Sequence, residues 1–162
     1  MPYSDLLREH KIRRGRRSRS EITAALAGAR QRLRSAGIEA NGLDVRHNLA
    51  YEAVRVLAQV VMAAEGYRAA MAAGQHQVIF EFLARVDAGR WEREADYFDK
   101  ARLRRNVSEY QQFGLISAKR TDDLIAAAEQ FLAEVREWLA ERGMIEEQGS
   151  SDDRSSDSTD TL

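Results

Sequence analysis

The stretch LDVRHNLAYEAVRVLAQVVMAAEGYRAAM, residues 43–71, decides the fold of this chain. Its apolar residues recur three or four positions apart, which is the spacing of one face of an α-helix. The residues expected on that inward face are Leu49, Ala53, Val56, Leu57, Val60 and Ala64. Because so long an apolar stripe needs partners along its whole course, we expect this helix to be the centre of a helical bundle. Gly66 is expected to bend or end it, and Gly74 closes the segment.

Four further segments have apolar residues at helical spacing and are joined by short loops. Ser18 and Glu21 have the spacing of a capping box at the start of the first of them. The expected helices span residues 20–36, 75–86, 91–113 and, beginning near Ser117 or Thr121, up to Gly143. These elements predict an all-α fold, an antiparallel bundle of four to five helices over residues 20–143.

The composition supports this fold class and excludes others. At 162 residues the chain has room for one domain with a proper core. Its single proline is residue 2, so the long stretches of strong helix formers are uninterrupted. The absence of cysteine excludes disulfides and thiolate metal sites and fits a cytoplasmic protein. The most apolar segment, residues 54–64, is interrupted by Arg55 and Gln59 and is too short to span a membrane.

The two ends of the chain carry opposite charge. The first 20 residues contain seven Lys and Arg against two acids, a net charge of +5, and the last 17 contain six acids against one Arg, a net charge of −5. We expect residues 1–19 to form a basic N-terminal arm, either a flexible surface segment or a phosphate-binding arm. Apolar residues could dock this arm onto the body: Leu6, Leu7 and Ile12. Residues 144–162, rich in Ser and Asp, are expected to be a disordered tail.

The segment DKARLRRNVSEY, residues 99–110, carries a polar row within an expected helix. Residues three or four positions apart form this row on one face: Asp99, Arg102, Asn106 and Tyr110. Apolar residues are expected close around it: Ala95, Phe98, Leu103, Val107 and Phe113. The row is therefore expected to face the protein. It is then either a hydrogen-bonded core network, in which Asp99 pairs with Arg102, or the lining of a site.

The arginines of this segment favour an anion-binding site. Arg102, Arg104, Arg105 and Asn106 offer donors suited to a phosphodiester. His76 is expected either to cap or flank a helix start or to reach the same cleft.

No metal and no cofactor are expected. The three histidines, His10, His47 and His76, lie on different elements without metal-ligand spacing. The sequence also lacks a phosphate-cradling glycine loop and a nucleophile elbow, so the enzyme classes that depend on those motifs are set aside.

The run LRRNVSEY, residues 103–110, resembles the motif of the HEPN domain superfamily. It is preceded by AYEAVRVLAQVVMAAEGYRA and GQHQVIFEFL and followed by a helix that ends in REWLAER, so the resemblance covers residues 20–142. Members of that superfamily are bundles of four to five helices, usually dimeric. Their motif is an Arg, often an Asn directly after it, and a His four to six residues beyond the Arg. Arg105 and Asn106 match it, and Tyr110 occupies the histidine position.

The resemblance implies a homodimer whose motifs meet in a cleft. Active HEPN ribonucleases cleave RNA there without a metal and leave a cyclic phosphate, which assigns catalytic positions to Arg105, Asn106 and Tyr110. A tyrosine, with an ordinary pKa of about 10, is a poor general base at neutral pH but can donate a hydrogen bond. Binding of RNA or a nucleotide needs only the Arg and Asn groups and is the function expected first. Many family members act in toxin–antitoxin or defence modules and pair with a small nucleotidyltransferase, which makes such a protein an expected partner.

Two alternatives stay open. The chain could be a metal-independent endoribonuclease, a toxin, in which Tyr110 or His76 replaces the missing histidine. It could instead be a structural protein-interaction module, in which the polar row is core and the basic arm or acidic tail contacts a partner. The structural alternative predicts that Asn106→Ala lowers stability by about 1–3 kcal/mol, because buried partners lose their hydrogen bond.

Overall fold

The computed structural model describes residues 2–70, 74–110 and 116–146, and of residues 105–110 it describes the backbone alone. The elements are, in order, α1 (Ser4–Arg8), β1 (Ile12–Arg14), α2 (Arg19–Ala36), α3 (Leu43–Ala64), β2 (Tyr67–Ala69), α4 (Gln75–Leu83), the 3-10 turn η1 (Val86–Ala88), α5 (Glu92–Tyr110) and α6 (Ala118–Glu141). This mostly helical architecture confirms the predicted all-α bundle. None of the helices in the described ranges is long and apolar enough to cross a bilayer.

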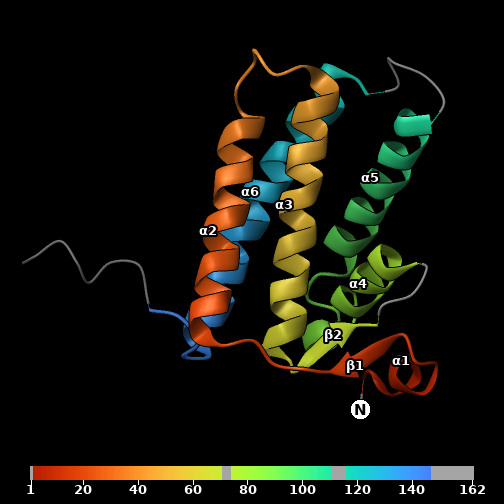
Figure 1. Ribbon diagram of the computed structural model, residues 1–162, viewed down its shortest axis with the longest axis vertical. Helices are drawn as coiled ribbons and strands as arrows, with labels where there is room; N and C mark the ends of the chain where they lie inside the picture. The colour runs from red at the N-terminus through yellow and green to blue at the C-terminus, as the bar shows by residue number, and fades with distance from the viewer. Residues whose placement is uncertain (1, 71–73, 111–115, 147–162) are drawn as a thin grey trace, which may run out of the picture.

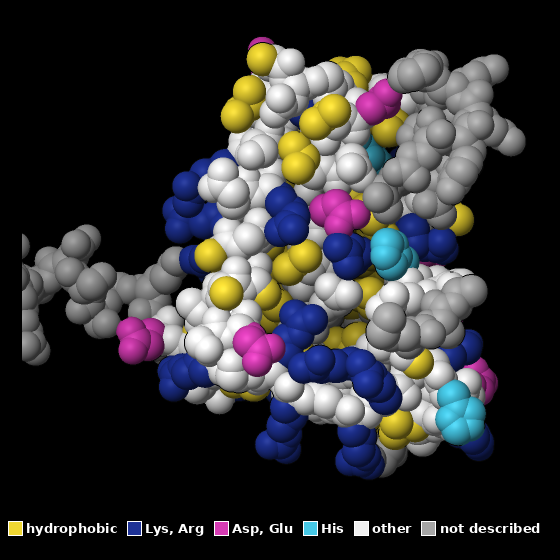
Figure 2. All heavy atoms as spheres, in the orientation of Figure 1, with side chains coloured by type: hydrophobic (Ala, Val, Ile, Leu, Met, Phe, Trp, Pro, Cys, Tyr) yellow, Lys and Arg dark blue, Asp and Glu magenta, His cyan; other side chains and the backbone are white. Residues whose placement is uncertain are grey.

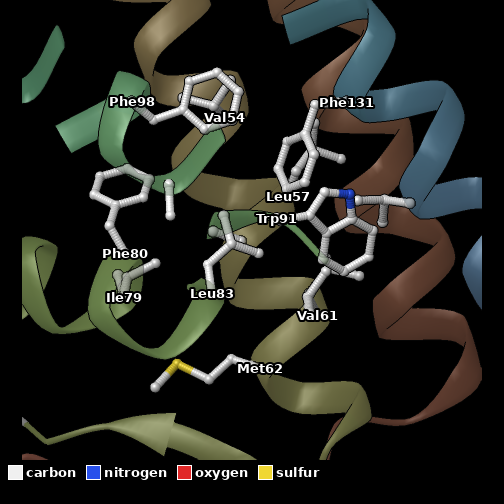
Figure 3. Packing of buried hydrophobic residues seen from close by; sticks show 14 of the residues in the cluster. Val54, Leu57, Val61, Met62, Ile79, Phe80, Leu83, Trp91, Phe98 and Phe131 are labelled. Carbon is white, nitrogen blue, oxygen red and sulfur yellow. The ribbon is translucent and has the colours of Figure 1, made fainter. Parts of the chain in front are cut away.

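Helix α3 is the centre of the bundle, as its sequence predicts. It packs against α2 and α6 on one side and against α4 and α5 on the other. It runs antiparallel to α2 and α5 and in the same direction as α6 (Figure 1). Figure 3 shows Val54, Leu57 and Val61 of α3 within the aromatic and aliphatic core. Side chains from α4, α5 and α6 complete that core, among them Leu83, Phe98 and Phe131, all of them buried. Each large side chain buried in this way contributes about 1.5–3 kcal/mol to stability.

The expectation that Gly66 bends or ends this helix is confirmed, and the helical pattern of residues 43–71 stops at Ala64. Gly66 adopts a φ of 93°, a left-handed conformation that ends the helix. Residues Tyr67–Ala69 then form β2, which pairs antiparallel with β1 in the register Ile12↔Ala69. The sequence analysis predicted neither strand. Both are short, and their pairing joins residues more than fifty positions apart.

The basic N-terminal segment is folded from residue 2 to residue 14 and is not a flexible extension there. The predicted docking through apolar residues is confirmed, since Leu6 and Ile12 are buried and Leu7 is half-buried against the core. Tyr3 adds a contact that was not predicted. Its ring stacks on Phe82 with the ring centroids 4.1 Å apart.

Two smaller differences concern Leu103 and the end of the bundle, and two further predictions fall outside the described residues. Leu103 is 49% exposed and does not join the apolar surroundings of the polar row. Met144 and Ile145 pack against the core, so the body extends beyond the predicted boundary at residue 143. The predicted disorder lies mostly in residues 147–162, and Phe113 lies in residues 111–115. Both ranges are outside the described residues.

Candidate functional site

The predicted site lies where α5 runs beside α3 and α4. Phe80 of α4 lies between Tyr51 of α3 and Phe98 of α5, with ring centroids 6.2 Å and 6.3 Å away. Helices α3 and α5 are antiparallel (Figure 1). Past Phe98, α5 therefore runs toward the same end of the bundle as the first turns of α3. That direction places the motif backbone beside the half of α3 that carries His47 and Tyr51.

Arg102 is held by its own helix. Its Nε donates to Oδ1 of Asp99 over 2.8 Å, and both side chains are partly buried. This confirms the predicted Asp99–Arg102 pair. The Asp99 carboxylate, one turn away, already neutralises the charge of Arg102. Arg102 is therefore less available than an unpaired arginine to bind an anion.

A hydrogen bond between helices joins Tyr51 and His76. Tyr51 Oη and His76 Nδ1 are 3.1 Å apart, and Tyr51 is fully buried whereas His76 is half-buried. His76 does not cap α4, since the N-cap residue is Gly74 and no side chain bonds that helix end. As the second residue of α4 it does flank that helix start, as predicted, and its bond to Tyr51 joins this helix start to α3.

Helix α3 carries polar residues that the sequence analysis did not assign to the site. Beside Tyr51, Glu52 accepts from Nη2 of Arg55 over 2.6 Å, and His47 is fully buried. Figure 2 shows acidic, basic and histidine side chains meeting over the middle of α3, where α4 approaches it. The signal was the four-residue spacing of His47, Tyr51 and Arg55 along the central helix of the bundle.

The structure does not bring Arg104 to the face of Arg102. Two residues correspond to about 200° of rotation around a helix, so the two side chains leave α5 on different sides. Arg104 lies close enough to Tyr97 to oppose the rise in that tyrosine's pKa, which burial causes. Among the described residues, the Nε of Arg104 is buried without a hydrogen-bond partner.

The three predicted catalytic residues lie in the last two turns of α5. The side chains of Arg105, Asn106 and Tyr110 are outside the described part of the structure, so the predictions for them rest on their backbone positions. Their spacing from Arg102 places Arg105 and Asn106 on its side of the helix. As far as the chain is described, no group of three His, Asp or Glu side chains could hold a metal ion.

Comparison of the chain with protein-family models, with curated proteins and with solved structures finds no match.

Proposed function

We propose that this chain is a HEPN-like protein that binds RNA or a nucleotide at the face where α5 meets α3 and α4. The observation that carries the proposal is the hydrogen bond between the buried Tyr51 and the half-buried His76, contributed by two other helices beside the motif-bearing half of α5. Polar groups turned into a helical bundle cost free energy unless they are satisfied. Polar side chains gather where α3 and α4 lie beside α5, which supports a binding site there rather than a purely structural contact.

The described geometry divides the roles among the arginines. Asp99 neutralises Arg102, and Arg104 leaves α5 on another side. Contact with a phosphate group is thus assigned to Arg105, with Asn106 as a further donor, because a guanidinium fork matches two phosphate oxygens.

In this proposal two copies of the chain form a homodimer through α5. The dimer is what the HEPN resemblance implies, with a two-fold axis beside the side of α5 that carries Arg105 and Asn106, so that the two motifs share one cleft. A nucleotidyltransferase of a toxin–antitoxin or defence module is the protein partner that the proposal implies.

The test compares the parent chain with Arg105→Ala and Asn106→Ala in fluorescence anisotropy with a labelled single-stranded RNA. Loss of a charge-assisted hydrogen bond predicts an affinity about 10- to 100-fold lower for Arg105→Ala. Arg34→Ala, which removes an exposed arginine of α2, is the matched control. The proposal is contradicted if the parent does not bind RNA, or if Arg105→Ala and the control bind it equally.

The same experiment separates binding from a structural role of Asn106. If the polar row is only core, Asn106→Ala lowers the melting temperature. If it is a binding site, Asn106→Ala weakens RNA binding and leaves melting unchanged.

A metal-independent endoribonuclease is the second candidate, and His76 favours it. Imidazole is the commonest acid–base group in enzymes, and His76 is bonded to Tyr51 of α3, the helix beside which the motif of α5 runs. This candidate requires cleavage of RNA in EDTA with cyclic-phosphate ends, and loss of cleavage in Arg105→Ala and, if His76 is the acid–base group, in His76→Gln. Cleavage that survives Arg105→Ala rules it out, whereas cleavage that survives only His76→Gln leaves Tyr110 as the replacement for the missing histidine.

A further inference from the structure

A second cationic feature lies at the other end of α3. A groove of about 140 Å³ opens between the β1–β2 ribbon and the adjoining ends of α3 and α4. Three arginines line it, Arg13, Arg17 and Arg68, together with the amides of Gln59 and Gln75. We call it the arginine groove. No acidic side chain lines it, and no carboxylate in the described ranges pairs with any of the three arginines.

The strand register places two of these arginines directly opposite each other. Arg13 pairs with Arg68 across the antiparallel ladder. Like charges at opposed positions of a ladder destabilise the pairing. The ribbon therefore carries a repulsion that an anion between the two guanidinium groups would remove.

The side chain of Arg68 is held in place, and one of its N–H donors has no hydrogen-bond partner among the described residues. Its Nη2 donates to the carbonyl oxygen of Arg16 over 3.0 Å, whereas its Nε is buried and has no hydrogen-bond partner in the part of the chain that is described. Its aliphatic stem crosses Gly15, where an added Cβ would lie 2.9 Å from Arg68 Cδ. The side chain is thus fixed before a ligand arrives, which lowers the entropy cost of binding.

The groove lies beside the last turns of α3, whereas the α5 site lies beside its first half. Helical spacing puts Asn48, Glu52, Arg55 and Gln59 in a single row, and Gln59 is part of the arginine groove. From Asn48 to Met62, beside the groove, the helix rises by about 20 Å. Figure 2 shows Lys and Arg side chains gathered over the lower part of this face, around β1, β2 and the start of α2.

We propose that the arginine groove binds a phosphate group of an RNA strand whose other end occupies the α5 site. The inference rests on the proposed function and sharpens it, because a mononucleotide is too small to contact two sites about 20 Å apart. An extended strand reaches both, and its phosphates suit a groove lined by guanidinium and amide donors. The ligand class is therefore single-stranded RNA rather than a free nucleotide.

The experiment measures binding of a labelled single-stranded RNA at several salt concentrations. The Arg13→Gln/Arg68→Gln double variant is compared with Arg30→Gln/Arg34→Gln, which removes the same charge from exposed positions in the second half of α2. Each lost phosphate contact reduces the slope of log affinity against log salt by about 0.7, so the groove variant, which loses one such contact, is expected to lose about 0.7 and the control less. Its affinity is expected to fall at least about tenfold below that of the control.

The outcomes separate this inference from the function on which it rests. Equal affinity and slope for the groove variant and its control overturn the arginine groove. A normal Arg105→Ala variant beside a weakened groove variant supports the groove and overturns the α5 site. No binding by the parent overturns both. Should the double variant melt early, Arg17→Gln, which lies outside both strands, is measured in its place and decides in the same way.

Discussion

At the scale of single residues, Asp87 links η1 to the last turns of α6. It adopts a left-handed conformation with a φ of 46°, which Asp and Asn tolerate better than most residues. Its Oδ2 accepts a hydrogen bond from the indole N–H of Trp138 over 2.7 Å. Trp138 is buried, and the guanidinium of Arg142 lies over its ring at 4.0 Å. Asp87 therefore satisfies a buried donor that has no access to water.

Asp87→Ala is expected to lower the free energy of unfolding by about 1–3 kcal/mol, because the Trp138 N–H loses its acceptor and Ala tolerates the positive φ poorly. Asp87→Asn keeps an acceptor oxygen and the conformational tolerance, so its loss is expected to be smaller. Urea denaturation measures the free energy of unfolding of both variants. The control is Glu137→Ala, which removes an exposed side chain from α6, the helix of Trp138. A value for Asp87→Ala within about 0.5 kcal/mol of that control contradicts this role.

The residue scale also shows which parts of the site were predictable. The Asp99–Arg102 pair follows from residues three apart on one helix, so local spacing was enough to predict it. The Tyr51–His76 bond joins residues 25 positions apart on two helices, and no local pattern contains it. Arg104 was grouped with Arg102 by charge alone, although helical rotation separates them.

At the scale of elements, α2 begins with the predicted capping box. Ser18 Oγ accepts from the backbone N–H of Glu21 over 3.2 Å, and the Glu21 carboxylate accepts in return from the backbone N–H of Ser18. The cap lies where the chain leaves the ribbon and enters the bundle. It therefore sets the point from which Ile22 and Leu26 reach the core.

Ser18→Ala is expected to cost about 1 kcal/mol of stability, because the first turn of α2 loses a hydrogen-bond acceptor. Ser18→Asp retains an acceptor and places a negative charge at the positive end of the helix, so its stability is expected to stay near that of the parent. Thermal unfolding followed by circular dichroism compares the three chains. If Ser18→Ala loses no more stability than Ser18→Asp, the hydrogen-bond acceptor at this position contributes nothing.

At the scale of the whole molecule, Tyr3 joins the N-terminal segment to the bundle core. Its ring stacks on Phe82 and meets Tyr67 edge-on at 5.5 Å. Burial raises the pKa of Tyr3 from 10.0 to about 12, and the nearby Glu65 carboxylate adds to this rise. The folded chain thus holds the phenol proton in a range of pH where the unfolded chain releases it.

This difference predicts a loss of stability at high pH. The contribution of Tyr3 is fully present below a pH of about 10 and is lost as the pH rises toward about 12, because the unfolded state then binds fewer protons than the folded state. Tyr3→Phe removes the titrating group and is expected to flatten the fall across that window. Urea denaturation at several pH values gives the two slopes. The residual slope of the variant comes from other groups whose pKa is also raised: Tyr97 by burial, Lys11 by its hydrogen bond to Glu9 and Lys119 by its hydrogen bond to Asp123. Identical slopes in both chains would exclude a role for Tyr3.

Local sequence patterns were sufficient for the helices and their order. Apolar spacing, the Ser18 cap and the glycines at helix ends act within one or two turns, so the central α3 and the all-α bundle could be predicted. Tertiary structure decided the features that depend on contacts between residues far apart in the sequence. The β1–β2 ribbon, the Tyr51–His76 bond and the opposed Arg13 and Arg68 all join segments far apart in the chain. Each forms only after the helices have packed, because strands of three residues and single polar contacts are too weak to form alone in water.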